Sequence, residues 1–254
     1  MKRFFPTMYS KPETIQIFFL IPACIWVFIL FPMFMPFLGL GLWEQWEISV
    51  WLEIGYHVAN GILALFLIFA YLKEEIFMVT ADFRFYLKHI LLTVGLILGV
   101  ELVWLGALYL GGFDLAVMLE SLPVSAMSVV HTSLSLVHFQ PVFGTIALSV
   151  FAPITVCALF YCLGFAPLCN IKPWLGYLGV AVITLIPPII NILWRGEAAL
   201  ALGGYLACLP VHLLACWSYQ KTDNVWTPLL SLVGANLLMS GLLQIYLVLQ
   251  PGVV

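Results

Sequence analysis

Residues 86–110 read YLKHILLTVGLILGVELVWLGALYL, and this stretch decides the class of the whole chain. After Lys88 its only Asp, Glu, Lys or Arg residue is Glu101. A helix needs about 20 mostly apolar residues to cross the hydrocarbon core of a bilayer. The stretch meets that length with almost no charge, so it predicts a transmembrane helix.

The rest of the chain has the same character. Of its 254 residues, 64% are hydrophobic and only 8% are charged, whereas a soluble domain carries roughly 25% charged residues. The aromatic share of 15% suits the Trp and Tyr belts found at membrane interfaces. The net charge of −3 is spread thinly, without a basic patch that would bind nucleic acid. We therefore expect the lipid bilayer to be the main surrounding of this protein.

The fold class that follows is all-α: a polytopic membrane helical bundle of about seven transmembrane helices. The candidate spans are 15–43, 48–72, 86–110, 142–168, 174–193, 198–219 and 226–249. The stretch 114–140 is apolar but rich in serine and contains Pro123. It is either a re-entrant or interfacial segment or an eighth span. The chain thus divides into an N-terminal tail (1–14), a first group of helices (15–141) and a C-terminal helical core (142–254).

The basic residues set the expected orientation, because cytoplasmic loops of membrane proteins carry an excess of Lys and Arg. If the N-terminus is cytoplasmic and 114–140 does not cross, only Arg195 of the nine Lys and Arg residues lies outside. If 114–140 crosses, two of the nine lie outside. We therefore expect a multi-pass protein of the cell membrane with a cytoplasmic N-terminus. Its longest hydrophilic loops would be 73–88 and 220–225, with Glu74 and Glu75 solvated in the first.

Ionisable side chains inside membrane spans are costly and are functional candidates by default. Glu53, His57 and Asn60 are spaced i, i+4, i+7, so they share one helical face. The further candidates are Glu101 and His212, and Asn236 is added by a motif described below. The interpretations stay open: a proton or metal site, hydrogen bonds between helices that lock the bundle, or a position near the outer headgroup zone of the membrane. His131 and His138 also share a helical face, which is a weaker signal.

Neither the cysteines nor any enzyme motif points to a metal or a cofactor. None of the six cysteines forms a C-x-x-C pair, and most lie in apolar runs, so we interpret them as small buried hydrophobic residues. They are Cys24, Cys157, Cys162, Cys169, Cys208 and Cys216. The chain also lacks H-E-x-x-H, G-x-S-x-G and P-loop motifs. We expect no bound metal and no cofactor.

Four short motifs mark the C-terminal half. They are Phe151-Ala152-Pro153-Ile154, Lys172-Pro173-Trp174-Leu175, Gly203-Gly204 and Tyr219-Gln-Lys-Thr222-Asp-Asn-Val-Trp226-Thr-Pro228. On these motifs, residues 142–245 resemble the CPBP family, the intramembrane glutamate proteases related to the CAAX-processing enzyme and also called Abi-type proteins. The fourth motif is the most specific, because it follows the family's turn Tyr-x-x-Thr-Gly-x-x-Trp-x-Pro. The resemblance covers about 40% of the chain.

The residues that carry catalysis in that family are missing here. Its Glu-Glu-x-x-x-Arg motif falls on Val156, Cys157 and Tyr161, and its Phe-x-x-x-His motif falls near 184–188, where there is no His. Its His-x-x-x-Asn motif falls on Leu232 and Asn236, so only the Asn remains. In that chemistry a glutamate activates water, and histidines orient it and stabilise the oxyanion. The resemblance therefore implies a member without catalytic residues.

We expect such a member to act as a membrane scaffold or to bind a partner. The partner would be another membrane protein, a lipid, or a lipidated or transmembrane peptide. One alternative is a transporter or permease-like subunit, with Glu53, His57 and Glu101 along an intramembrane polar pathway. A second alternative is an active intramembrane peptidase with a non-standard site.

Overall fold

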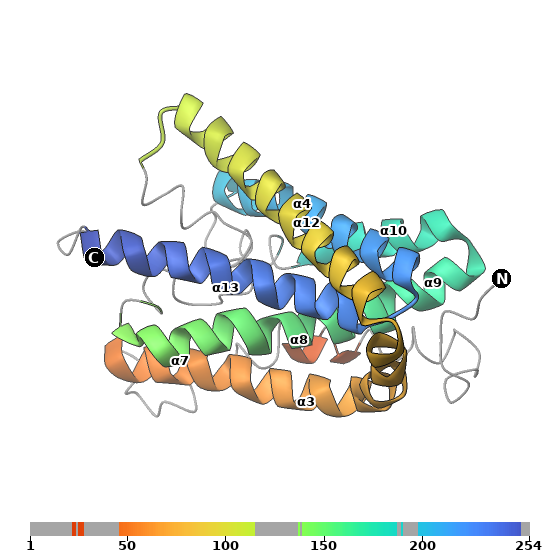
Figure 1. The fold of residues 1–254 in the computed structure, drawn as a ribbon. Coiled ribbons are helices and arrows are strands. Elements are labelled where there is room, and N and C mark those ends of the chain that lie inside the picture. Colours follow the sequence, from red (N-terminus) through yellow and green to blue (C-terminus); the bar gives the residue numbers. More distant parts are fainter. Residues whose placement is uncertain are drawn as a thin grey trace.

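A computed structural model of the chain describes residues 22–23, 25–27, 46–114, 137, 139–186, 189 and 198–249. Throughout these residues the protein is helical, and no strand occurs among them. Figure 1 shows the helices gathered into one elongated bundle. The all-α class is therefore confirmed. Most of the span expected at 15–43 and most of the segment 114–140, with His131 and His138, lie outside the described residues.

The described helices follow the predicted spans closely. They are α3 (Trp46–Ala81), α4 (Phe83–Leu110), α7 (Pro141–Ile146), α8 (Ala152–Val156), α9 (Ala166–Ile171), α10 (Pro173–Thr184), α12 (Ala198–Thr222) and α13 (Trp226–Leu249). The π-helical segments η5 (Ala147–Phe151) and η6 (Cys157–Phe165) join α7, α8 and α9 into one continuous helical rod. There are two large departures. Helix α3 runs to Ala81, well past the predicted end at residue 72, and α10 ends at Thr184, well before the predicted end at residue 193.

The hydrophilic loop predicted at 73–88 does not exist, so that prediction was wrong. Helix α3 continues through Lys73 to Ala81, and α4 begins at Phe83. Asp82 alone makes the turn, and its side chain accepts a hydrogen bond from the amide of Phe85 at 3.4 Å. The helix continues because its last turns are held by tertiary contacts of Glu75, which is buried rather than solvated.

The two π-helical segments have a common local cause. Each ends directly before an Ala-Pro pair, Ala152-Pro153 after η5 and Ala166-Pro167 after η6. Proline has no amide hydrogen to donate into the helix, so the regular i to i−4 pattern is interrupted there. The amides of Ala152 and Ala166 bond to the carbonyls of Ala147 and Tyr161, five residues back. The rod stays continuous but shifts its hydrogen-bond register twice.

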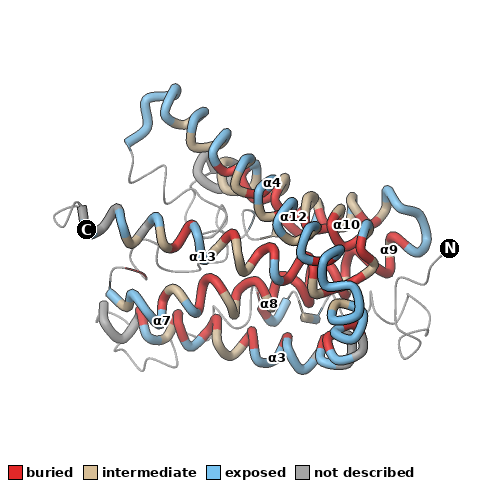
Figure 2. Tube along the Cα trace, viewed as in Figure 1, coloured by how far each residue is buried: buried red, intermediate tan, exposed pale blue. Residues whose placement is uncertain are grey.

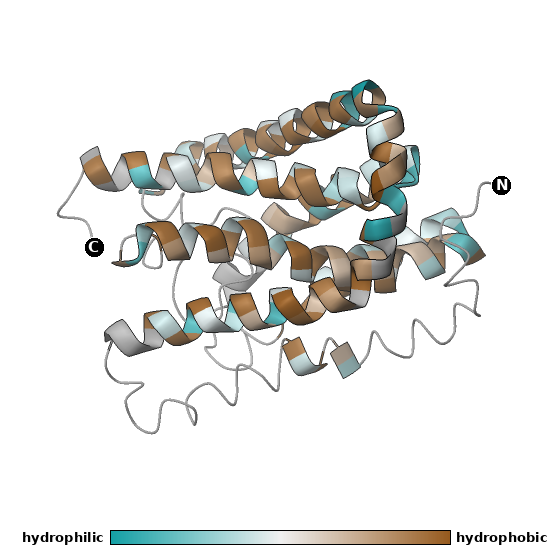
Figure 3. Ribbon diagram, turned by 60° about the horizontal axis from the view of Figure 1, so that its bottom comes forward, coloured by the Kyte–Doolittle hydropathy of each residue, from teal (hydrophilic) through white to brown (hydrophobic). Residues whose placement is uncertain are grey.

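The polar turns of the chain lie at one end of the bundle. The indole of Trp226 donates to the carbonyl of Leu72 at 2.8 Å, which joins the start of α13 to the last third of α3. The hydroxyl of Tyr177 donates to the side chain of Gln220 at 2.7 Å, which brings the α9–α10 turn to the same end. Figure 3 shows hydrophilic residues concentrated there, while the helices between the two ends are mostly hydrophobic. Lys73, Arg84, Lys88, Lys172 and Lys221 all belong to this end.

The opposite end holds the start of the rod and the end of α13, since Gln244 donates to the carbonyl of Pro141 at 3.2 Å. Helix α4 runs parallel to α13, because Ser231 donates to the carbonyl of Ile90 and Gly234 lies against Val94. Leu110 therefore lies at the same end as Pro141 (Figure 1). The described residues on the two sides of 115–136 thus lie at one end of the bundle.

Two helical stretches are long and apolar enough to cross a membrane, Phe83–Leu110 and the rod Pro141–Ile171. They differ in their surroundings. The rod lies in the centre of the bundle, whereas α4 turns most of its surface outward (Figure 2). The outward side chains of α4 are large and apolar, such as Leu91, Leu102 and Val103. Soluble monomers rarely expose a continuous apolar surface of this kind, and lipid would cover it.

The turn between α12 and α13 contains the one non-glycine residue with positive φ among the described residues. Asp223 has φ of 52°, a left-handed conformation that costs other residues about 1–2 kcal/mol relative to glycine, and Asp somewhat less. We expect Asp223→Gly to raise the melting temperature in mild detergent by a few degrees. Asp223→Val should lower it, because a β-branched residue fits this conformation worst. A lower melting temperature for the glycine variant would contradict this explanation of the turn.

Candidate functional site

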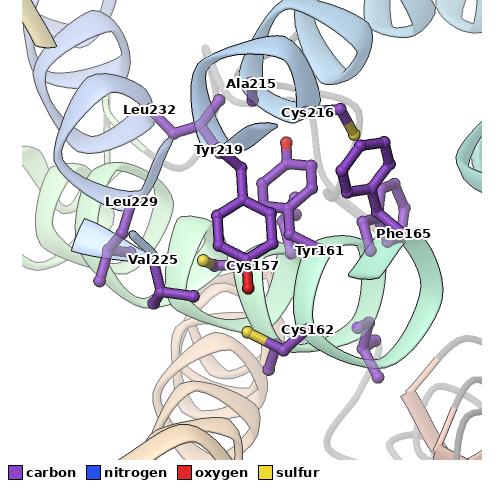
Figure 4. Close-up of a cluster of buried hydrophobic side chains, with 14 of the residues drawn as sticks. Cys157, Tyr161, Cys162, Phe165, Ala215, Cys216, Tyr219, Val225, Leu229 and Leu232 are labelled. Carbon is purple, nitrogen blue, oxygen red and sulfur yellow. The ribbon is translucent and has the colours of Figure 1, made fainter. Parts of the chain in front are cut away.

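Four of the positions implied by the family resemblance are buried in one hydrophobic cluster. Val156, Cys157 and Tyr161 come from the central rod, Leu232 comes from α13, and all four are buried in one hydrophobic cluster. We call it the motif cluster; Figure 4 shows most of its central side chains. Its other members include Cys162, Phe165, Ala215, Cys216, Tyr219, Val225 and Leu229. One buried carboxylate borders this cluster, since Glu75 accepts a hydrogen bond from the amide of Val225 and lies within electrostatic range of Cys162. Packed apolar side chains lie at Val156, Cys157 and Leu232, where the resemblance implies catalytic groups.

His212 enters this region from α12 and contacts Tyr161. The Tyr161 hydroxyl lies 3.1 Å from Nδ1 of His212, and the edge of the same imidazole packs against the ring of Phe160 at 4.7 Å between centroids. His212 is therefore tied to a tyrosine and a phenylalanine of the rod. A buried histidine with a hydrogen-bonded neighbour is accounted for by packing, so this contact favours a structural role.

The polar face predicted on α3 is real and faces inward. Glu53, His57 and Asn60 are all buried, and this side of α3 packs on η5 and α8. Within the described part of the chain, Nε2 of His57 and both amide atoms of Asn60 have no hydrogen-bond partner. Each such atom costs roughly 1–3 kcal/mol when buried.

Glu101 lies on a different interface. It continues the buried stripe of α4 that includes Thr93 and Ile97, and Thr93 is bonded to Ser218 of α12 at 3.0 Å. The carboxyl of Glu101 lies within electrostatic range of Cys208 on α12. Glu101 is only 1% exposed, and neither of its oxygens has a hydrogen-bond partner among the described residues. It is the least compensated acidic group that the structure describes.

Asn236 has a structural explanation. Its amide donates to the carbonyl of Leu148 at 3.2 Å. That carbonyl lacks its usual helical donors, because the amide of Ala152 bonds to Ala147 and Pro153 has no amide hydrogen. Asn236 therefore compensates the π-helical break of the rod. Ser149 and Ser240, 2.9 Å apart, join the same two elements.

The six predicted polar residues do not form one site. Helix α3 packs on the rod, whereas α4 packs on α12 and α13, so His57 and Asn60 lie in a different interface from Glu101. They do share a depth in the bundle. Two hydrophobic clusters lie one above the other along the bundle. On α3 the pair lies between them, with Ala64 in the first cluster and Ile54 in the second. On α4 Glu101 also lies between them, with Ile97 in the first cluster and Leu105 packed against the second. The result is a polar layer whose members are separated by helices.

The sequence analysis missed Glu75, the acidic residue with the best-defined contacts. Its carboxylate accepts a hydrogen bond from the amide of Val225, and its carbonyl accepts one from Asn224 at 3.1 Å. Asn224 in turn accepts from the amide of Trp226 at 2.8 Å. A signal was present in the sequence, because Glu75 continues the buried α3 stripe of Ile68 and Leu72 at helical spacing.

The cysteines are buried as predicted, at least the five that the structure describes, and none of these five forms a disulfide. Among the described residues, no three His, Cys, Asp or Glu side chains lie close enough together to hold a metal ion. No family model, no curated protein and no solved structure matches this chain. The assignment of a function therefore rests on the residues themselves.

Proposed function

We propose that this chain is a non-catalytic membrane protein with a bundle like that of the intramembrane glutamate proteases. It would act as a scaffold or bind a partner of the bilayer: another membrane protein, a lipid, or a lipidated or transmembrane peptide. The observation that carries the proposal is the motif cluster. Val156, Cys157, Tyr161 and Leu232 are all buried members of one hydrophobic cluster, which supports a role in packing rather than in hydrolysis.

The turn between α12 and α13 supports the family part of the proposal. Asp223 stands where the family's turn has glycine, and its φ of 52° is a conformation that favours glycine. Thr222 and Trp226, the two flanking motif residues, both make local or tertiary hydrogen bonds. Thr222 donates to the carbonyl of Ser218 at 2.9 Å, and Trp226 donates to Leu72. The motif thus has a physical role here that does not depend on catalysis.

The separation of the polar residues also favours a scaffold over a continuous ion path. A relay needs donors and acceptors within hydrogen-bond reach of one another. Glu101 and the pair His57 and Asn60 instead occupy different helix interfaces. Their side chains have no hydrogen bonds to one another in the described structure. The pathway interpretation would require a chain of waters across the rod.

We further propose seven membrane spans with a cytoplasmic N-terminus in the cell membrane. The support is the collection of Lys73, Arg84, Lys88, Lys172 and Lys221 at one end of the bundle, as the positive-inside rule requires for the cytoplasmic side. The last residues of α4 and the first residues of α7 lie at the other end, which supports a segment 114–140 that does not cross the membrane.

Reporter fusions test this topology. Fusions after Lys73 and after Lys221 should both report a cytoplasmic location, and a fusion after Gly112 should report the outside. The physical reason is the bias of Lys and Arg toward the cytoplasm. Opposite locations for Lys73 and Lys221 would rule out the proposed arrangement.

Peptidase assays test the absence of catalysis. Purified protein incubated with prenylated and transmembrane peptides should cleave none of them, since a missing general base costs ~10²–10⁴ in rate and a missing oxyanion donor ~10²–10³. Binding of a peptide, read as a higher melting temperature, is the expected outcome for at least one member of the panel. The controls are Cys157→Ala and His212→Ala. Cleavage that disappears in either variant would establish a cysteine-based enzyme and overturn the proposal.

A further inference from the structure

One face of α4 has no partner among the described elements of the chain. The helix packs on α12 and α13, and its buried residues are Tyr86, Thr93, Ile97 and Glu101. On the opposite side, positions 84, 88, 95, 99 and 106 fall on one helical face, and the residues there are all exposed. They are Arg84, Lys88, Gly95, Gly99 and Gly106, and we call this surface the glycine face (Figure 2). Because α4 is a membrane span, a molecule of the bilayer covers this face.

The glycines of this face are not explained by packing within the described chain. Glycine weakens a helix relative to alanine, and close approach of another group usually accounts for it. A methyl group at Gly95, Gly99 or Gly106 would meet no atom within 4 Å. The exposed side chains that flank these positions are large and apolar: Leu91, Leu96, Leu102 and Val103. An apolar chain lying on this face would therefore contact the helix backbone directly.

The same face carries two positive charges at the end proposed as cytoplasmic. Arg84 and Lys88 are one helical turn apart, and neither forms an ion pair within the described part of the chain. The helix from Lys88 to Leu110 is about 33 Å long, close to the ~30 Å thickness of a hydrocarbon core. Lys88 thus matches the inner boundary of the hydrocarbon, and Arg84, one turn further out, matches the depth of the lipid phosphates.

Charge distinguishes between the two kinds of molecule that could cover this face, a second copy of the chain and a lipid. Two copies in one membrane share one orientation, so a symmetric contact between their glycine faces would bring the two basic pairs together. Like charges repel, and the acidic residues of this region face elsewhere. Glu101 is buried on the opposite side, and Asp82 caps the helix by accepting from the amide of Phe85. An anionic headgroup complements Arg84 and Lys88, whereas a second copy does not.

We propose that the glycine face binds one anionic phospholipid of the cytoplasmic leaflet. Arg84 and Lys88 hold the phosphate-bearing headgroup through charge-assisted hydrogen bonds. One acyl chain lies along the backbone at Gly95, about 10 Å from Lys88, and ends near Gly99. Gly106 is about 27 Å from Lys88 and so belongs to the opposite leaflet, since one leaflet of the core is about 15 Å deep. The proposal rests on the membrane topology proposed above and on no residue of the motif cluster.

Native mass spectrometry of the full chain, released from mild detergent, tests the site. The probes are dioleoylphosphatidylglycerol, which is anionic, and dioleoylphosphatidylcholine, which is zwitterionic with the same acyl chains. Wild-type protein should bind the anionic lipid about tenfold more tightly than the zwitterionic one. The double variant Arg84→Gln/Lys88→Gln should lose that preference. Gly95→Leu keeps both charges and should weaken binding of the anionic lipid by about threefold or more, because it holds the acyl chain away from the backbone.

Two control variants match these changes. Lys172→Gln/Lys221→Gln removes two exposed charges at the same end of the bundle but on other helices. Gly106→Leu adds the same side chain as Gly95→Leu to the same face, at an equally open position in the other leaflet. Both controls should bind the anionic lipid like wild type.

Equal affinity of wild-type protein for the two lipids overturns the proposal, as does a preference that persists in Arg84→Gln/Lys88→Gln. A loss in either control equal to that in its matched variant also overturns it, since the effect would then not depend on position. A lipid-free dimer that Gly95→Leu dissociates would show that a second copy covers the face. If the double variant does not elute as a folded protein in size-exclusion chromatography, Gly95→Leu against Gly106→Leu decides. Lipid affinity in detergent does not depend on orientation, so a failure of the proposed topology appears only in the reporter fusions.

Discussion

Replacing Glu75 by alanine is expected to lower the free energy of unfolding by about 1.5–3 kcal/mol, the range for a hydrogen bond to a charged group. Glu75 is 2% exposed and accepts the amide hydrogen of Val225, directly before α13 begins. Without it, that amide is left unpaired between α3 and α13. The melting temperature in mild detergent, measured beside wild type, gives the size of the effect.

The control for this variant is Lys73→Ala, two residues earlier on the same helix. Lys73 is exposed, and surface substitutions usually change stability by no more than about 0.5 kcal/mol. Glu75→Gln should fall between the two, because an amide oxygen can still accept the bond but without its charge. Equal melting temperatures for Glu75→Ala and Lys73→Ala would show that the last turns of α3 do not hold α13.

Replacing Gly61 by alanine should have an effect of similar size through packing. A methyl group at Gly61 would lie 2.6 Å from Cδ1, 2.8 Å from Cβ and 3.1 Å from Cα of Phe151. Rotating the phenylalanine relieves only the first of these contacts, so α3 itself has to move away from the rod. Overpacking of this kind costs typically about 1–3 kcal/mol. The same thermal measurement in detergent should record the loss.

Gly55→Ala is the matched control, since Gly55 lies on the same helix and an added methyl group there meets nothing within 4 Å. Alanine is the better helix former by about 1 kcal/mol, so this variant should be as stable as wild type or more stable. Gly61→Ala and Gly55→Ala therefore shift stability in opposite directions. A loss of stability in both would point to glycine flexibility in α3 rather than to close contact with Phe151.

Helical stretches were predictable because each one is specified locally. The apolar runs 86–110, 142–168 and 226–249 reappear as helices with nearly the same ends. The prolines inside the central run did not end the helix, because the backbone forms π-helical turns directly before them. Helical periodicity also places Glu53, His57 and Asn60 on one face, and the structure shows that all three are buried.

The candidate site was less predictable, because sharing a face or a depth does not establish contact. His57 and Glu101 both belong to the polar layer, yet helices α3 and α4 place them in different interfaces. The role of Asn236 depends on the carbonyl of Leu148, which lacks its helical hydrogen-bond donors. Hydrophobic periodicity cannot predict which carbonyl of another helix lacks a donor. Glu75 was assigned to a loop because a run of charges usually marks solvent, whereas a contact 150 residues away in the chain holds it inside.

By itself, the sequence determined the all-helical class, the positions of the helices and the burial of the cysteines. These properties follow from hydrophobicity and backbone hydrogen bonding, which act over one or two helical turns. Only the tertiary structure decided which ends of the helices meet, that four of the motif positions are buried in one hydrophobic cluster, and that Glu101 lies near Cys208 of α12. The physical reason is that these features depend on which helix packs against which, and a helix carries the same periodic pattern whichever neighbour it has.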